Sequence, residues 1–532
     1  MAFKFQTNDD VKFIHDEALL KKAEALRPSI KREEIKPLRV VELTEDSSKL
    51  NGWGVIESKK DIKNLKQYEL MKDKSLILDF GDHRVGSFQI HIDKVGSPQD
   101  APLYLRIKFA EVPAELAAES SDYEGWLSRS WIQEEFVHID ELPHVLKLTR
   151  RYSFRYVELK VIDTSPKWAA VFSDPLVTTE SSADYSKLPK VELEDPELQK
   201  IYDVGVKTLA DCMQDVFEDG PKRDRRLWLG DLRLQALANY ATFDNTELVK
   251  RCLYLFAGMT TEEGKISANV FVKPSYVPDD TFLFEYSMFF ISTLYDLHQT
   301  HPYLELVQEL YPIAQKQMDI TLAMFNNEGK LIVDKNYPVF VDWSQDFNKD
   351  TAGQAEVIYV LRQFIALSKE IGAENIDYYQ SALDKISKYA KEVLYDPKKK
   401  LFVTNGTEYN IASQVWMVLS RVMTDAENKE IMESMIDTLF PIKDIATPYM
   451  YHHIVEALFV AGLNEDAVEL MKNYWGKMIQ LGADTYWEAF CPEKPEYSPY
   501  GSPIINSYCH AWSCTPVYLI RKYCIDGDGG CL

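Results

Sequence analysis

The sequence predicts a multidomain α and β protein, with an N-terminal β-sandwich followed by a large all-α domain built as an (α/α)6 toroid. Two observations predict this fold. Apolar residues tend to alternate between about residues 38 and 165, whereas they recur at helical spacing from residue 191 onward. A chain of 532 residues is also too long for one ordinary core, because single domains usually hold roughly 100–200 residues.

Three segments of the first part are predicted strands. Residues 74–92 (KSLILDFGDHRVGSFQIHI), 102–112 (PLYLRIKFAEV) and 154–162 (FRYVELKVI) tend to alternate apolar and polar side chains, and Gly, Pro and Asp turns separate them. Short strands divided by turns are typical of a β-sandwich. We therefore expect a helical or loose lead-in over residues 1–37, a β-sandwich over 38–165 and a linker over 166–190.

The second part, residues 191–532, is predicted to be helical. The spacing of apolar residues indicates twelve helices, at 195–215, 231–243, 245–258, 283–300, 304–326, 352–372, 376–395, 409–422, 425–439, 449–462, 464–481 and 507–524. Twelve helices in pairs fit an (α/α)6 toroid. An α-solenoid would also pair its helices, but it would usually show a sequence repeat, and no strong repeat is visible. Loops on one face of a toroid can converge on a single funnel.

The charge and apolar patterns exclude several classes of function. The formal net charge of −23 is spread along the chain, which argues against binding to nucleic acid or to an anionic membrane surface. No window approaches the apolar length of a membrane-spanning helix. The first residues carry charges throughout, so we expect no secretory signal. Nothing in the sequence indicates an oligomeric state.

The cysteine pattern indicates neither a metal site nor a disulfide framework. The seven cysteines contain no C-x-x-C pair, and no His or Cys spacing around them suits zinc. We therefore expect reduced, buried thiols in a cytoplasmic protein, with no metal and no cofactor.

Carboxylates beside aromatic rings recur in the predicted loops. Glycosidic bond cleavage uses this combination, because one carboxylic acid protonates the leaving oxygen while a second carboxylate activates water or attacks the anomeric carbon. Taken singly, such acids are more often surface ion pairs, and such tryptophans are more often packing residues. Together they favour a carbohydrate site. The clusters are 218–235 (EDGPKRDRRLWLGDLRLQ) with Asp219, Asp224, Trp228 and Asp231; 279–287 (DDTFLFEYS) with Asp279, Asp280, Glu285 and Tyr286; 340–347 (FVDWSQDF) with Asp342, Trp343 and Asp346; and 484–490 (DTYWEAF) with Asp484, Tyr486, Trp487 and Glu488, followed by His510 and Trp512 in 507–512 (SYCHAW).

The first cluster resembles a motif of the α-L-rhamnosidases of glycoside hydrolase family 78, Asp-Cys-Pro-x-Arg-Glu-Arg-x-Gly-Trp-x-Gly-Asp. The segment here is DGPKRDRRLWLGD, residues 219–231. The glutamate of the family, its presumed general acid, falls on Asp224, while its cysteine falls on Gly220 and its first glycine on Leu227. The matches without a gap are Asp219, Pro221, Arg223, Arg225, Trp228, Gly230 and Asp231.

The resemblance extends from about residue 75 to 524. The strand segments look like the β-sandwich that precedes the barrel in this family. TYWEAF, residues 485–490, is similar to a Thr-x-Trp-Glu segment whose glutamate is the general base, which maps to Glu488. NSYCHAWSCTPVYL, residues 506–519, is similar to a closing segment whose histidine touches the sugar, which maps to His510. The resemblance implies an (α/α)6 barrel and inversion at the anomeric centre.

These matches imply a role for each candidate residue. Asp224 would protonate the leaving oxygen and Glu488 would activate water, with Glu285 as the alternative acid or a substrate-binding residue. Aspartate is one methylene shorter than glutamate, and three neighbouring arginines would lower the pKa of Asp224, whereas nearby acids would raise it. The residues expected to bind the sugar, fix Asp224 or line the pocket are Asp219, Arg223, Trp228, Asp231, Trp343, Trp487 and His510.

The predicted activity is hydrolysis of terminal α-L-rhamnose from small glycosides or oligosaccharides. Two alternatives stay open. One is another glycosidase on the same toroid, such as a hydrolase of unsaturated glucuronyl sugars. The other is a relative that binds sugar without cleaving it.

Overall fold

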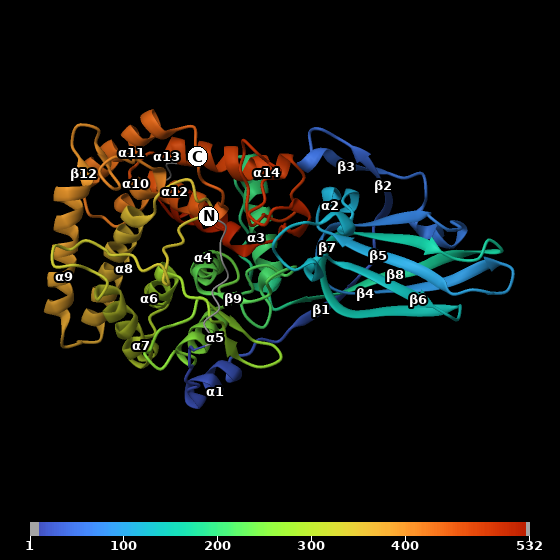
Figure 1. The fold of residues 1–532 in the computed structure, drawn as a ribbon, viewed down its shortest axis with the longest axis horizontal. Coiled ribbons are helices and arrows are strands. Elements are labelled where there is room, and N and C mark those ends of the chain that lie inside the picture. The colour runs from blue at the N-terminus through green and yellow to red at the C-terminus, as the bar shows by residue number, and fades with distance from the viewer. Residues whose placement is uncertain (1–9, 528–532) are drawn as a thin grey trace.

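The computed structural model describes residues 10–527 and consists of two parts that lie side by side (Figure 1). Strands fill one part and helices the other. Helix α1 (Glu17–Ala25) packs against α5 (Thr246–Ala257) of the helical part before the chain enters the sheet. The predicted lead-in therefore contains a helix, and its first nine residues lie outside the described range.

The sheet is antiparallel, and its eight strands run in the order β1-β8-β4-β7-β5-β6, with β2 paired to β3 and β4. The three predicted strand segments correspond to β4, β5 and the end of β7. The first strand, β1, falls within the predicted lead-in. The strands are β1 (Lys31–Ile35), β2 (Arg39–Glu45), β3 (Trp53–Glu57), β4 (Ser75–Gly96), β5 (Leu103–Ala110), β6 (Glu134–Ile139), β7 (His144–Asp163) and β8 (Trp168–Ser181).

Alternation of side chains along the long strands builds the core of this part. Phe109 on β5 stacks on Tyr152 of β7 with ring centroids 3.8 Å apart, and Phe80 on β4 meets Phe154 edge to face at 5.5 Å. All four rings are buried. Strand β4 pairs with β2 near its start and with β8 along its second half, and its register with β7 shifts between Asp79 and Arg84. The sheet therefore changes partners across an irregularity in β4.

The prediction of a linker over residues 166–190 is wrong for most of that stretch. Strand β8 occupies Trp168–Ser181 and pairs with both β1 and β4. The error has a local cause, because Ser173, Asp174 and Pro175 are residues of turns. Here they form a bulge inside the strand, where the register against β4 shifts and Asp174 takes a φ of 50°.

The helical part follows the predicted spacing closely up to α14. The last predicted helix, 507–524, differs, because residues before α15 form a loop and Pro516 occupies the first turn of that helix. The helices are α3 (Pro196–Cys212), α4 (Leu229–Tyr240), α5 (Thr246–Ala257), α6 (Phe284–Thr300), α7 (Leu304–Leu322), α8 (Asp350–Glu370), α9 (Ile376–Tyr389), α10 (Ile411–Leu419), α11 (Asp425–Leu439), α12 (Pro448–Val460), α13 (Asn464–Met471), α14 (Lys477–Gln480) and α15 (Pro516–Leu519).

Alternate helices form a closed chain of contacts. Helix α4 contacts α6, α6 contacts α8, α8 contacts α10 and α10 contacts α12, while α15 contacts both α12 and α4. We call these six helices the inner helices. Helices α5, α7, α9, α11 and α13 each pack against the inner helix that precedes them in the chain, as α5 does against α4. The burial fits these positions, since Phe284–Leu294 of α6 is wholly buried, whereas α9 buries a single stripe of Tyr379, Leu383 and Ile386.

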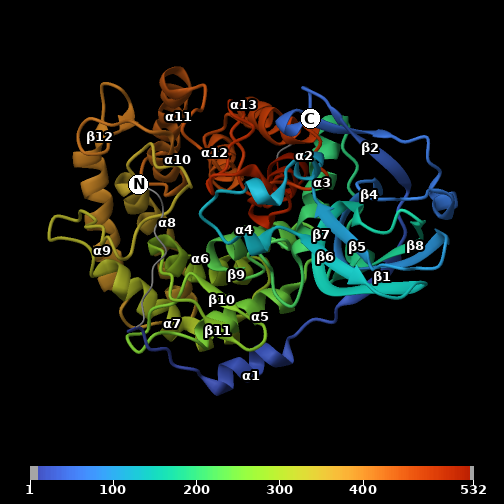
Figure 2. The same ribbon diagram turned by 45° about the vertical axis from the view of Figure 1, so that its right-hand side comes forward.

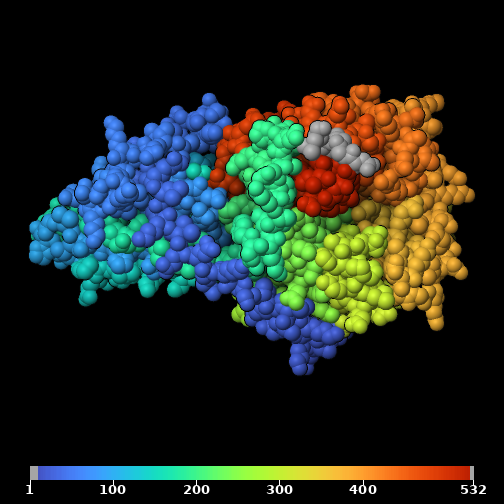
Figure 3. All heavy atoms as spheres, turned by 180° about the vertical axis from the view of Figure 1, so that it is seen from behind, coloured from blue at the N-terminus to red at the C-terminus, as the bar shows by residue number. Residues whose placement is uncertain are grey.

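The two parts meet over a broad contact, which Figure 3 shows from behind. Arg155 on β7 bonds Asp79 on β4 at 2.8 Å and Asp484, in the loop after α14, at 2.7 Å. The segment between α2 (Pro113–Ala117) and β6 also reaches from the sheet toward the helical part (Figure 2). These contacts place residues of the sheet-containing part next to the loops at one end of the inner helices.

Within residues 10–527, no helix is long and apolar enough to cross a membrane.

Most of the cysteines in the described residues are reduced. Cys212, Cys252, Cys491, Cys509 and Cys514 are free thiols, and all but Cys491 are buried, as expected. Cys524 differs from the prediction of reduced thiols, because it is disulfide-bonded.

Candidate active site

A cavity of about 400 Å³ opens at the N-terminal ends of α4 and α6, between the loops of the helical part and one loop of the sheet-containing part. It brings together eight of the ten predicted site residues. Its lining consists of Trp126, Leu127, Ser128, Trp131, Asp219, Arg223, Asp224, Arg226, Trp228, Asp231, Asp279, Asp280, Thr281, Leu283, Tyr286, Phe340, Trp343, Glu488, Tyr500, His510 and Trp512.

The loop before α4 is closed by the carboxylate of Asp219. That carboxylate accepts the backbone N–H of Asp224 and of Arg226, each at 3.0 Å, and the backbone N–H of Asp219 donates to the carbonyl of Arg226. The peptide bond between Arg223 and Asp224 is cis, and Arg225 has a φ of 63°. The backbone of Asp224 is therefore fixed, and its side chain, which is 20% exposed, lines the cavity.

The sequence predicted that three neighbouring arginines would act on the carboxylate of Asp224, but the structure places only one of them close to it. Only Arg223 approaches it, with a distance of 3.6 Å from Nη1 to Oδ1. Arg225 turns away and donates to two backbone carbonyls, at 3.1 and 2.9 Å. Arg226 pairs instead with Asp279 at 3.7 Å. The loop geometry separates charges that are adjacent in the sequence.

Glu488 lies in the same cavity and is held by two donors. Arg223 donates from Nη2 to one carboxylate oxygen at 2.5 Å, and the Tyr500 hydroxyl donates to the other. The Arg223 guanidinium also lies over the Tyr500 ring, 4.0 Å from its centroid. Burial, together with the charge of Glu488, raises the pKa of Tyr500 well above its ordinary value, which keeps the phenol a donor.

The floor of the cavity holds two acids and a histidine. Burial and the charge of Asp224 raise the pKa of Asp219 to about 8, while burial and the charge of Asp219 raise the pKa of Asp231 well above its ordinary value. Burial and the nearby Arg223 charge lower the pKa of His510 to about 3. Burial therefore disfavours the charged form of both acids and of the imidazole.

Some polar atoms of this floor lack hydrogen-bond partners. His510 Nδ1 lies 3.6 Å from Asp231 Oδ1, which is too long for a good hydrogen bond. Among the described residues neither atom has another partner, although both are buried. Buried polar groups are nearly always satisfied, so these two atoms are available to bond a ligand or water.

Glu285 and Trp487, two of the residues predicted to contact a substrate, do not line the cavity. The Glu285 carboxylate accepts the backbone N–H of Phe340 at 2.8 Å and of Val341 at 2.7 Å, where Val341 takes a φ of 54°. Glu285 therefore holds the turn that carries Trp343. Trp487 is 1% exposed and packs edge to face on Phe490.

Sequence reasoning missed one wall of the cavity. Residues 126–131 (WLSRSW) belong to the sheet-containing part, and Tyr500 lies in a loop that no pattern distinguishes. The paired tryptophans of the WLSRSW segment were the available signal. They lie in the predicted β-sandwich, whereas the predicted acid and aromatic clusters all lie in the helical part.

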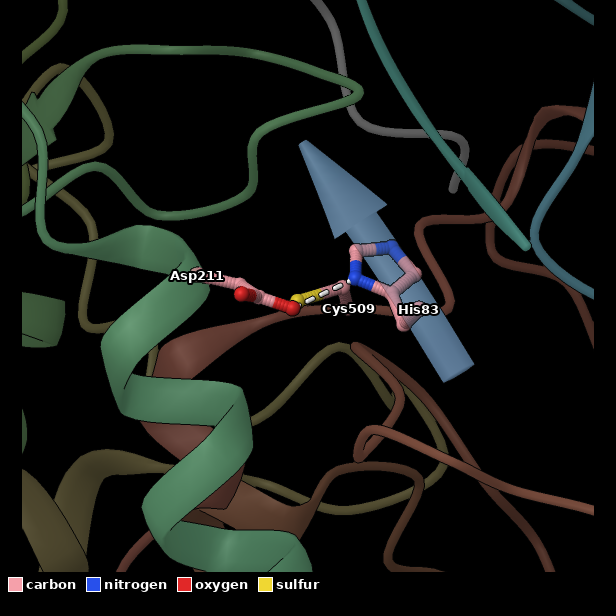
Figure 4. A group of neighbouring side chains, drawn as sticks. All are labelled: His83, Asp211 and Cys509. Carbon is pink, nitrogen blue, oxygen red and sulfur yellow. Dashed lines mark hydrogen bonds and ion pairs between the residues drawn. The ribbon is translucent and has the colours of Figure 1, made fainter. Parts of the chain in front are cut away.

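A buried polar network joins the two parts beside this site (Figure 4). His83 on β4, Asp211 on α3 and Cys509 place three ligand-type atoms within 4.8 Å of one another, which sequence spacing did not indicate. His83 Nδ1 lies 2.7 Å from Asp211, and its Nε2 lies 3.2 Å from Glu111. Since Lys207 also bonds Asp211, protein groups already satisfy the imidazole and the carboxylate. The network fixes the domain contact next to His510.

Comparison with known families decides the assignment. Residues 37–179 match the glycosyl hydrolase family 78 α-rhamnosidase N-terminal domain, and residues 187–524 match the bacterial α-L-rhamnosidase six-hairpin glycosidase domain. The chain belongs to glycoside hydrolase family 78. A search of curated proteins gives no match.

Solved structures agree with membership of family 78. A rhamnosidase from Klebsiella oxytoca with rhamnose bound is 43% identical, with a TM-score of 0.93, and the alignment covers 96% of this chain and 100% of that one. A family 78 rhamnosidase of Bacillus sp. GL1 is 21% identical with a TM-score of 0.70, over 84% of this chain and 46% of that one. An α-L-rhamnosidase of Streptomyces avermitilis complexed with L-rhamnose is 16% identical with a TM-score of 0.66, and the alignment covers 93% of this chain and 44% of that one. This chain thus spans less than half the length of the latter two enzymes.

Two glycines of the family 78 motif segment allow close packing at the site. A Cβ on Gly230 would lie 2.4 Å from the Tyr286 ring, so its absence lets that ring pack against the start of α4. A Cβ on Gly220, which stands at the cysteine of the motif, would lie 2.6 Å from the carbonyl of Arg223. The loop carrying Asp224 therefore folds tightly on itself, and a side chain at Gly220 would push it apart.

Proposed function

We propose that this family 78 glycosidase is an inverting α-L-rhamnosidase in which Asp224 is the general acid and Glu488 the general base. The observation that carries the proposal is the presence of both carboxylates in one cavity, on separate loops bridged by Arg223. Inverting enzymes use a pair of carboxyl groups in this way, with a separation of roughly 6.5–9.5 Å that leaves room for water.

The surroundings of each carboxyl group support its role. Two donors orient Glu488, and a general base must be oriented toward the water that it deprotonates. Asp224 is anchored through its backbone, and its part-exposed side chain can reach a leaving oxygen. The closed loop around Asp219 offsets the shorter side chain of aspartate by setting the backbone at the edge of the cavity.

The floor is proposed to hold the rhamnose ring. Asp219, Asp231 and His510 offer donors and acceptors for hydroxyl groups, and the unpaired atoms of Asp231 and His510 are the first candidates for contact. The C6 methyl group of rhamnose needs an apolar surface. Aromatic side chains in the lining can supply it, namely Trp228, Tyr286, Phe340, Trp343 and Trp512.

The architecture proposed here is a β-sandwich followed by an (α/α)6 toroid. The closed chain of contacts through α4, α6, α8, α10, α12 and α15 supports the toroid. Strand β4 changes partners at an irregularity, as strands do where they pass between two packed sheets, which supports the sandwich. We place the domain boundary between Ser181 and Pro196, after β8 and before α3.

The substrates proposed are small glycosides with terminal α-L-rhamnose. The sequence also predicted a cytoplasmic location, and we retain it as a proposal that fractionation of the native cells with an antibody against the chain can test. Family membership favours rhamnosides over the glucuronyl substrates considered as an alternative, and a panel of aryl glycosides measures that preference directly.

Hydrolysis of methyl α-L-rhamnoside, whose alkoxide leaving group needs a proton, by the wild type and two variants tests the catalytic pair. Asp224→Asn and Glu488→Gln should each lower kcat by about a hundred- to ten-thousand-fold, because each removes one proton transfer. Glu493→Gln, an exposed residue near Glu488 in the chain, is the matched control and should keep full activity. NMR of the first product should show inverted rhamnose. Full activity in either catalytic variant, or retention of configuration, would refute the proposal.

A further inference from the structure

One wall of the cavity comes from the sheet-containing part rather than from the helical part. The segment 118–133 between α2 and β6, which we call the sheet loop, contributes Trp126, Leu127, Ser128 and Trp131 to the lining. Figure 2 shows this cyan segment reaching toward the helical part.

The sheet loop is fixed to the loop that holds Glu488 in place. Trp126 donates from Nε1 to the carbonyl of Pro499 at 3.0 Å, and its ring lies 5.4 Å from that of Tyr500. The hydroxyl of Tyr123 donates to the carbonyl of Leu127 at 3.0 Å, within the sheet loop itself. These contacts give the tryptophans defined positions before any ligand arrives, which lowers the entropic cost of binding.

Exposure divides the cavity into a floor and an opening. Asp219, Asp231 and His510 on the floor are 2–4% exposed, whereas Trp126 is 37% exposed. A terminal sugar held on the floor must direct the rest of its glycoside toward the opening. Trp126 therefore lies where the leaving group of a bound glycoside would pass.

Asp224 and the sheet loop line the same cavity. A general acid protonates the leaving oxygen, so the leaving group is on the side of Asp224. The next residue, Arg225, places its guanidinium over the Trp131 ring, 5.9 Å from the centroid. The exposed opening and this contact between the acid-bearing loop and the sheet loop together favour this wall for the leaving group.

We propose that the sheet loop is the leaving-group subsite, with Trp126 and Trp131 stacking on a planar aromatic ring attached directly to rhamnose. This inference rests on the proposed function. Two indoles and Leu127 leave Ser128 as the one polar side chain that this loop adds to the lining. A second sugar would need several converging polar groups, whereas a flat aromatic ring needs faces to stack on.

The acid at Asp224 suits such a leaving group. Phenols ionise with a pKa near 10, far below that of ordinary alcohols and water, so a phenolic oxygen leaves with less help from a proton donor. An aspartate with a shorter reach than glutamate is adequate for that task. The N-terminal domain then has a catalytic purpose, which is selection of the aglycone.

Comparison of leaving groups tests the proposal. In Trp126→Ala, kcat/KM for 4-methylumbelliferyl α-L-rhamnoside should fall by roughly three- to tenfold, the value of one aromatic contact, while kcat/KM for methyl α-L-rhamnoside changes by less than about twofold. Inhibition by free rhamnose should not change. Trp126→Phe, which keeps a ring, should retain most activity on the aryl substrate. Phe136→Ala, an exposed aromatic on β6 outside the cavity, is the matched control.

The outcomes separate this inference from the catalytic proposal. An equal fall for both rhamnosides, or no fall for either, would overturn the leaving-group subsite even if Asp224 and Glu488 act as proposed. If the wild type hydrolyses neither rhamnoside, the catalytic proposal fails, and binding decides the subsite. Titration with a non-hydrolysable aryl thio-rhamnoside should then show the same selective loss in Trp126→Ala relative to rhamnose, and an equal loss would refute it.

Discussion

Arg223 and Glu488 form a buried ion pair, with 2.5 Å between Nη2 and Oε2, and this pair joins the two loops that carry the proposed acid and base. The same guanidinium lies 3.6 Å from Asp224 and donates from Nε to the carbonyl of Ile505 at 2.8 Å. A planar cation with several donors can do this, whereas a single ammonium cannot. The arrangement of the catalytic carboxyl groups therefore depends on an arginine at position 223.

Arg223→Lys should impair catalysis strongly while leaving a folded protein. Lysine keeps the positive charge near Glu488, but it loses the Nε donor to the carbonyl of Ile505 and the stacking over the Tyr500 ring. We expect kcat on an aryl rhamnoside to fall about 100-fold, with a smaller change in KM. Arg223→Ala should also unfold at a lower temperature, because it leaves a buried carboxylate unpaired, a loss of about 3–5 kcal/mol. Unchanged kcat in Arg223→Lys would show that Arg223 does not position the pair.

Tyr500→Phe isolates the second donor to Glu488. The substitution removes one hydroxyl and keeps the ring beneath Arg223 and beside Trp126. Hydrogen bonds to charged groups contribute about 1.5–3 kcal/mol, so kcat should fall by about 10- to 100-fold with the melting temperature little changed. Tyr497→Phe, three residues earlier and outside the lining, serves as the control. Equal effects of the two substitutions would indicate general disturbance of the loop.

The stability of the protein should depend on pH through His510. Its folded-state pKa is lowered to about 3, whereas an unfolded histidine titrates near 6.5. Between these values the unfolded chain binds a proton that the folded chain does not, so the free energy of unfolding decreases as pH falls from about 6.5 toward 3. The full contribution is present above pH 6.5. The slope from this one group is at most about 1.4 kcal/mol per pH unit.

His510→Gln should reduce that slope, because glutamine does not titrate. Chemical denaturation at pH 7.5, 6.0 and 4.5 measures the free energy of unfolding for both proteins, and the difference between them should shrink or reverse as pH falls. His15→Gln, at an exposed position near the N-terminus, should keep the wild-type slope. A parallel dependence in wild type and His510→Gln would mean that His510 is protonated in the folded state.

Much of the fold was predictable because its elements obey simple periodicities. The helices α3 to α13 repeat an apolar stripe, and β4, β5 and β7 alternate. The exceptions are segments whose local sequence pattern is typical of a different structure from the one that they form. Asp174 and Pro175 made a bulge in β8 resemble a linker, and the segment before α15 was helical in pattern but serves as a loop bearing His510.

Site residues that lie close together in the chain could be predicted from the sequence, whereas residues whose role depends on contacts distant in the chain could not. Asp219, Asp224 and Asp231 occur in one motif, and the cavity contains all three. The role of Glu285 could not be read from sequence, because an acid in the first turn of a helix looks the same whether it faces a ligand or clamps a turn. Trp126 reaches the cavity through a contact between domains, which no local pattern encodes.

Asp224→Glu tests whether the loop is built for the shorter acid. The carboxylate of Asp219 fixes the backbone N–H of Asp224 at 3.0 Å, and Gly220 closes the loop tightly behind it. An added methylene would push the acid past the leaving oxygen, so kcat should fall by about 10- to 100-fold, although the family motif has glutamate here. Asp280→Glu adds the same methylene elsewhere in the lining and should have a smaller effect. Equal or higher activity in Asp224→Glu would show that the loop moves to accept either acid, and the position of the backbone would then not determine the reach of the proton donor.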